Sequence, residues 1–144
     1  MAPKTTDTRR AYYAHAAAVF ALAPLTIGVL ATLNPKLGLS LLNFPLPGPT
    51  ASPKDQATIY GLIRFFGIRD VVIGASSLCV WFFGGAREGE RKGCRALGGM
   101  MLMGVALVGV DGLASREVIG GGEWNHWALA PVGVGLGAGL MGWV

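Results

Sequence analysis

Three charged residues stand inside one of the most apolar segments of this 144-residue chain. The segment covers residues 57–83 and carries Arg64, Arg69 and Asp70. A charge at the centre of a lipid bilayer costs roughly 2.5–3.5 kcal/mol on insertion scales, so such charges usually face a protein interior or a wet cavity and have a partner. These three residues are therefore the first candidates for a functional site.

Three further residues could join this site. Asp111 is expected near the far end of the third apolar segment, and His126 begins the fourth segment at the same level. Tyr60 lies four residues before Arg64, on the same face of a helix. Together they predict a pocket that opens to the non-cytosolic side of a membrane, with the two mid-membrane charges as its floor.

Helix geometry limits how these charges can pair. Arg64 and Asp70 point about 120° apart, because six residues separate them along a helix. We therefore expect Arg64 to pair with Asp111 on another helix, and Arg69 to pair with Asp70 locally or through water. A buried ion pair can also serve only to fix the register of two helices, and that role needs no ligand.

A carboxylic acid in a water-poor cavity can donate a proton in catalysis, and a nearby base can accept one. The candidates for proton transfer are Asp70, Asp111 and His126. The candidates for substrate binding are Tyr60, Arg64 and Arg69. The chain has no P-loop, no GxSxG elbow and no His/Cys spacing typical of a metal site, which favours a redox-neutral reaction without a metal or another cofactor. A histidine beside two tryptophans is also typical of an interface anchor.

The composition indicates a single membrane domain that spans residues 1–144. Apolar residues make up 52% of the chain and charged residues only 14%, whereas a soluble domain carries about 25% charged residues. The 23 glycines suit closely packed membrane helices. The apolar segments predict membrane spans over residues 11–33, 57–83, 94–113 and 124–144. Four such helices would form an all-α, antiparallel four-helix transmembrane bundle.

The connections between the segments predict the topology. Residues 44–53 contain four prolines and predict an irregular loop on the non-cytosolic side. The apolar residues 37–44 just before it should lie in the membrane interface or fold back as a lid. Seven basic residues, from Lys4 to Arg10 and from Arg87 to Arg95, fall on one side of the predicted spans, against three on the other. This distribution places both termini in the cytosol.

Two classes of partner can be weighed from the same residues. The net charge of +4 lies in the connections and is not accompanied by an aromatic and basic platform, so nucleic-acid binding is excluded. The lipid bilayer and a lipophilic small molecule are the expected partners. Gly133 and Gly137, like Gly135 and Gly139, have the GxxxG spacing of closely packed helices. We expect this packing within the chain, and a homodimer stays open as the alternative.

The stretch IYGLIRFFGIRDVVIGA, residues 59–75, resembles a family of uncharacterised small four-helix integral membrane proteins that are common in filamentous fungi and occur in some bacteria. Members typically carry an arginine and then Gly-x-Arg-Asp in the second helix. The corresponding residues here are Arg64, Gly67, Arg69 and Asp70. The resemblance implies no established chemistry. It hints at natural-product biosynthesis, because some fungal members are encoded among such genes, and at the endoplasmic reticulum if the source is eukaryotic.

Three functions fit these observations. The first is a membrane-embedded enzyme of the cyclase or isomerase type that acts on a lipophilic small molecule. The second is a proton-coupled carrier, although four helices lack the inverted repeats of many transporters. The third is a non-catalytic membrane scaffold for a biosynthetic enzyme. An enzyme predicts a closed apolar pocket that ends at Asp70 or Asp111. A carrier predicts polar access from both sides, and a scaffold predicts paired charges without a cavity.

Overall fold

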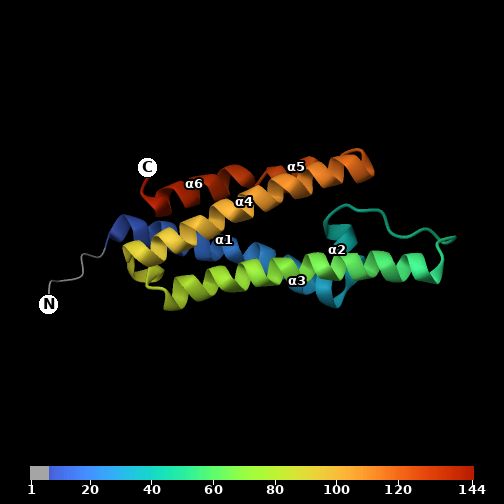
Figure 1. Ribbon diagram of the computed structural model, residues 1–144, viewed down its shortest axis with the longest axis horizontal. Helices are drawn as coiled ribbons and strands as arrows, with labels where there is room; N and C mark the ends of the chain where they lie inside the picture. Colours follow the sequence, from blue (N-terminus) through green and yellow to red (C-terminus); the bar gives the residue numbers. More distant parts are fainter. Residues whose placement is uncertain (1–6) are drawn as a thin grey trace.

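The computed structural model describes residues 7–144, and over that range the chain is all-helical, without a strand. Figure 1 shows the long helices lying side by side along one axis. The predicted all-α class is therefore confirmed. The elements in chain order are α1 (Thr8–Leu33), α2 (Pro35–Leu41), α3 (Pro53–Phe83), the 3-10 turn η1 (Ala86–Glu88), α4 (Arg91–Ile119), α5 (Glu123–Trp127) and α6 (Ala130–Met141).

Three of these helices are long and apolar enough to cross a bilayer. Helices α1, α3 and α4 have 26, 31 and 29 residues. At a rise of 1.5 Å per residue they measure roughly 39 to 46 Å, which exceeds the about 30 Å of hydrocarbon in a bilayer. Large apolar side chains such as Phe65 and Met103 point outward from them and are 78% and 70% exposed. Such a surface suits contact with lipid and would be unfavourable in water.

The predicted fourth span, residues 124–144, is wrong as a continuous helix. The chain forms the five-residue helix α5, turns at residues 128–129, and then forms the twelve-residue helix α6. Pro131 stands in the first turn of α6 and has no N–H to continue the hydrogen bonding of α5, which explains the break. Helix α6 measures only about 18 Å, so three long helices and one two-part segment replace the predicted bundle of four.

Helices α1 and α3 approach each other through glycines. A Cβ atom at Gly67 of α3 would lie 2.5 Å from Thr32 Oγ1 and 2.7 Å from the carbonyl oxygen of Gly28 in α1. Only a residue without a side chain allows backbones to come this close. This glycine contact fixes the position of α3 against α1.

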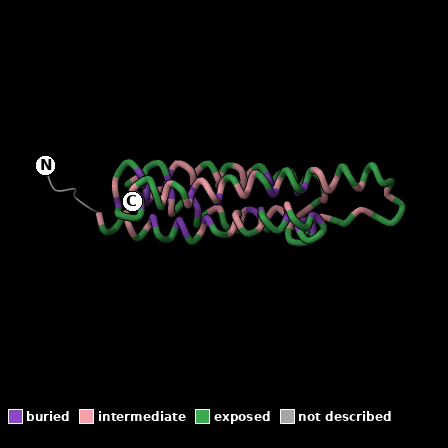
Figure 2. The backbone as a smooth tube through the Cα atoms, turned by 90° about the horizontal axis from the view of Figure 1, so that it is seen from below, coloured by how far each residue is buried: buried purple, intermediate pink, exposed green. Residues whose placement is uncertain are grey.

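Figure 2 shows the buried residues on the inner sides of the helices and the exposed residues on the outside.

Helix α6 packs along α4 in a similar way. Gly133 and Gly137 face Val105 and Leu102 of α4, so these two glycines serve the packing within the chain that their spacing predicts. Gly135 faces open space. A homodimer therefore stays a prediction.

Helix α2 folds back onto the long helices, as one of the two predicted arrangements has it. Asn34 caps α2, with its side-chain oxygen accepting from the backbone N–H of Leu37 at 3.2 Å. Leu39 packs against Ala31 of α1 and Ile63 of α3 in a small apolar cluster. The Pro-rich stretch that follows is irregular up to Ser52, which caps α3.

The described chain begins and ends at the same end of the molecule (Figure 1). The connection between α3 and α4 lies there too, whereas residues 42–52 and the connection between α4 and α5 lie at the opposite end. The antiparallel order of the long helices is therefore as predicted. Which end faces the cytosol stays a prediction, and Lys4, one of the residues on which it rests, lies outside the described residues.

Candidate functional site

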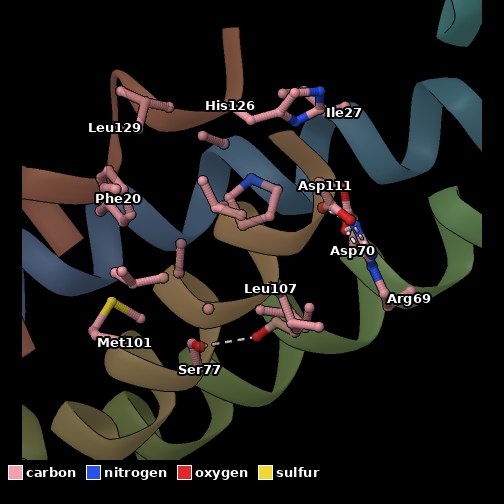
Figure 3. A pocket seen from close by; sticks show the side chains of 18 of the residues that line it. Phe20, Ile27, Arg69, Asp70, Ser77, Met101, Leu107, Asp111, His126 and Leu129 are labelled. Atoms are coloured by element: carbon pink, nitrogen blue, oxygen red, sulfur yellow. Dashed lines mark hydrogen bonds and ion pairs between the residues drawn. The ribbon is translucent and has the colours of Figure 1, made fainter. Parts of the chain in front are cut away.

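The centre of the candidate site is an ion-pair cluster between α3 and α4 (Figure 3). The Arg69 guanidinium donates from Nη1 to Asp111 Oδ1 at 2.9 Å and from Nη2 to Asp111 Oδ2 at 2.7 Å. It also donates to Asp70 Oδ1, from Nε at 3.1 Å and from Nη2 at 3.0 Å. Arg69 thus joins a carboxylate of its own helix to one of α4. Its contact with Asp111 uses both carboxylate oxygens, which is the bidentate geometry that makes arginine–carboxylate pairs strong.

The cluster is largely shielded by the surrounding helices. Asp111 is 8% exposed, and the side chain of Asp70 is 16% exposed. The Cζ atom of Arg69 lies 3.9 Å from the centre of the Phe66 ring, so the guanidinium also rests on an aromatic face. Charges in such surroundings depend on their partners, because removing one partner leaves the other buried and uncompensated.

The predicted pairing of Arg64 with Asp111 is wrong, because Arg69 contacts both oxygens of that carboxylate. Arg64 and Arg69 are five residues apart on α3, which turns their side chains about 140° from each other. Arg64 consequently lies on the exposed side of α3 and forms no ion pair with a residue that the structure describes. The local pairing of Arg69 with Asp70 is confirmed at 3.0 Å.

Asp111 lies deeper in the molecule than its predicted place near the end of a helix. Helix α4 does not stop at residue 113 but continues to Ile119. Eight residues therefore follow Asp111 in the helix, which is about 12 Å. This depth allows Asp111 to meet Arg69, which stands near the middle of α3.

A cavity of about 160 Å³ lies beside the cluster, between α1, α3, α4 and α5. Most of its wall is apolar, with side chains such as Phe20, Ile27, Met101 and Leu107 (Figure 3). An apolar cavity with a few converging polar groups is the usual form of a small-molecule site. Its polar lining residues are Arg69, Asp70, Ser77, Asp111, Asn125 and His126.

Helix α5 brings His126 to this cavity. His126 is 9% exposed, and its Nε2 lies 2.9 Å from Ser115 Oγ of α4. The neighbouring Trp127 donates its Nε1–H to a backbone carbonyl of α4 at 3.2 Å. These two contacts hold α5 against α4, and they place His126 on the cavity wall. The sequence alone did not single out Ser115, although it lies four residues after Asp111 on the same helix face.

The structure brings together some of the predicted site residues and separates others. Tyr60 packs against the apolar cluster beside α2, and Arg64 faces outward, so neither of them lines the cavity. The predicted site residues that do line it are Arg69, Asp70, Asp111 and His126.

The cluster contains more negative than positive charge. Two carboxylates face one guanidinium, so the fully ionised group carries a formal charge of −1. Asp70 Oδ2 accepts no hydrogen bond from residues 7–144. All side-chain nitrogens and oxygens that are fully buried in that range have a hydrogen-bond partner. Because Asp70 Oδ2 has none in this range, this oxygen is not fully buried and is accessible. A proton or a cationic group can bind there. In the same range, no three His, Cys, Asp or Glu residues are placed to hold a metal ion.

The partner of Asp111 can be tested with a double-mutant cycle. We expect Arg69→Met and Asp111→Asn each to destabilise the protein, and the double variant to lose less than the sum of the two. Breaking a buried pair costs about 3–5 kcal/mol, and the second change removes the charge that the first leaves without its partner. The free energy of unfolding in an SDS titration measures this coupling.

A matched cycle serves as the control. Arg64→Met combined with Asp111→Asn should give additive losses, because Arg64 faces outward on the same helix. Coupling of Asp111 to Arg64 instead of Arg69 would contradict the geometry described above.

The comparison with known proteins extends over most of the chain. Residues 21–140 match the family described as domain of unknown function DUF4267. The match begins in α1 and ends in α6, so it includes the whole cavity wall apart from Phe20. No curated protein and no solved structure matches the chain. This helical protein with three long apolar helices belongs to the DUF4267 family.

Proposed function

We propose that this protein is a multi-pass membrane enzyme that catalyses a redox-neutral isomerisation or cyclisation of a lipophilic small molecule. The observation that carries the proposal is the apolar cavity with the carboxyl groups of Asp70 and Asp111 on its wall. A cavity at this depth lies among apolar helices, where a lipophilic molecule is concentrated and water is scarce. Acid–base chemistry in such a place gains from the exclusion of water.

The residues at the cavity divide into distinct roles. An isomerisation delivers a proton to one atom of the substrate and removes a proton from another, so atoms and electrons balance without an oxidant. We assign proton delivery to Asp70, because its Oδ2 is not engaged by Arg69. His126 accepts the proton that leaves the substrate. Asp111, held at both oxygens by Arg69, stabilises positive charge that develops in the transition state.

The two other functions explain less of the geometry. A scaffold needs paired charges to fix its helices but has no use for an apolar chamber beside them. A carrier needs polar access from both sides of the membrane. The polar lining residues gather near α5 instead, and apart from them only Ser77 interrupts the apolar wall.

Metabolite profiling of a producing host tests the enzymatic proposal. A host that lacks this protein should accumulate a defined lipophilic precursor, and the wild-type gene should clear it. Asp70→Asn should lower clearance at least a hundredfold, because an amide cannot deliver the proton and general acid catalysis contributes about 10²–10⁴ in rate. Asp111→Asn should also fail, since it removes the stabilising charge.

Glu117→Gln is the matched control, because this carboxyl lies on the exposed side of the same helix as Asp111. It should rescue like the wild type, and the membrane level of each variant is measured alongside. Full rescue by well-expressed Asp70→Asn and Asp111→Asn variants would refute catalysis at the cavity.

The topology that we propose has both termini in the cytosol. Its support is the gathering of Arg9 and Arg10 with Arg87 to Arg95 at the end of the molecule where the described chain begins and ends. In a protein with Cys79 and Cys94 replaced by alanine, an impermeant maleimide should label Gly48→Cys in intact cells. Both positions 48 and 144 are exposed, but Val144→Cys should react only after permeabilisation. The reverse labelling pattern would invert the topology.

A further inference from the structure

We propose that the cavity binds a small lipophilic cation, such as a protonated amine carried by a single ring. The inference rests on the proposed function for its biological meaning, because it names the charge class of the substrate at the same site. Its physical basis is independent of catalysis, since it concerns only what the cavity can hold.

The first argument is the charge of the wall. The ion-pair cluster has two carboxylates for one guanidinium, and both carboxylates line the cavity. An excess negative charge among apolar helices is costly unless something neutralises it. A ligand ammonium group at Asp70 Oδ2 would supply the missing positive charge and form a charge-assisted hydrogen bond. Along this hydrogen bond Asp70 takes up the ammonium proton, which is the proton that it delivers in the proposed reaction.

The second argument is that, given its contacts within residues 7–144, Arg69 has only one N–H group that is free to donate to an anion. A guanidinium has five N–H groups. Four of them are already used, because Nε and Nη2 donate to Asp70 while Nη1 and Nη2 donate to Asp111. A carboxylate or phosphate ligand would have to displace these contacts and would meet two carboxylates of the protein. The site therefore selects against anions.

The third argument is size and polarity. The cavity measures about 160 Å³, and an apolar cavity of about 150 Å³ in another protein takes up benzene. The group inside the cavity is therefore about one ring with a short substituent. Apart from the polar groups near α5 and Ser77, the wall offers only apolar contacts to such a ring, from side chains such as Phe20 and Ile73.

Three probes of nearly equal shape test the inference. Purified full-length protein in detergent is titrated calorimetrically at pH 7 with benzylamine, benzyl alcohol and benzoate, which are cationic, neutral and anionic. We expect benzylamine to bind at least tenfold more tightly than benzyl alcohol, and benzoate not to bind. Equal binding of the alcohol, tighter binding of benzoate, or no binding of benzylamine would each overturn the inference.

A filled cavity separates binding at the site from partition into detergent. Gly104 lines the cavity, and a Cβ there would meet nothing within 4 Å, so Gly104→Leu should fold and occupy the space. It should abolish the benzylamine signal. Gly99→Leu is the control, because Gly99 stands on the same helix, has equally open surroundings and does not line the cavity. Binding that survives in Gly104→Leu would place the probe elsewhere and overturn the assignment.

The role of the negative charge of Asp70 is tested separately from the role of the cavity volume. Asp70→Asn should remove the preference for amine over alcohol, whereas Glu117→Gln should keep it. If Asp70→Asn does not fold, the comparison of the three probes in the wild type still decides the charge class. A failure of this binding test leaves the precursor clearance by the wild-type gene unaffected, so it is distinguishable from a failure of the proposed enzymatic function.

Discussion

The ion pair between Arg69 and Asp111 is the contact on which the arrangement of α3 and α4 depends. Charged groups among apolar helices are stable only when they are paired, and this pair joins the middle of one long helix to another. On its other face α3 is fixed against α1 by glycine contacts that leave no room for a side chain. The cavity lies beside the ion pair, and side chains of α1, α3 and α4 all contribute to its wall. The same ion pair therefore orders the helices and supplies the polar part of the candidate site.

Much of the fold follows from the sequence because long apolar segments form helices, and α1 continues even across Pro24. The spans predicted from residues 11, 57 and 94 onward all lie within observed helices. The fourth failed because hydropathy does not register the missing N–H of Pro131, which breaks the segment into α5 and α6. The third predicted span ends at residue 113, whereas α4 continues past the polar residue Arg116 to Ile119.

The candidate site was predictable in its residue types but only partly in its pairing. Charged residues in apolar segments pointed to Arg69, Asp70 and Asp111, and the structure places all three on one cavity. The choice between Arg64 and Arg69 as the partner of Asp111 depends on which face of α3 meets α4. That face is set by small residues of α1 and α3, including Gly28 in α1 and the pair Gly67 and Gly74 in α3. The seven-residue spacing of that pair is easily overlooked in a glycine-rich chain. The contact of His126 with Ser115 of α4 depends on the short helix α5, which a prediction of one continuous span over residues 124–144 does not contain.

Solid-state NMR in lipid bilayers can measure the central contact directly. In protein labelled with ¹⁵N-arginine and ¹³C-aspartate, the dipolar coupling between guanidinium nitrogens and carboxyl carbons reports ion pairs within the membrane. The structure predicts strong couplings from Arg69 to both Asp111 and Asp70. The Asp111 coupling should disappear in Asp111→Asn, both should disappear in Arg69→Lys, and both should persist in Arg64→Lys. A coupling that disappears in Arg64→Lys, or the absence of any coupling sensitive to Asp111→Asn, would contradict the account of how α3, α4 and the cavity are held together.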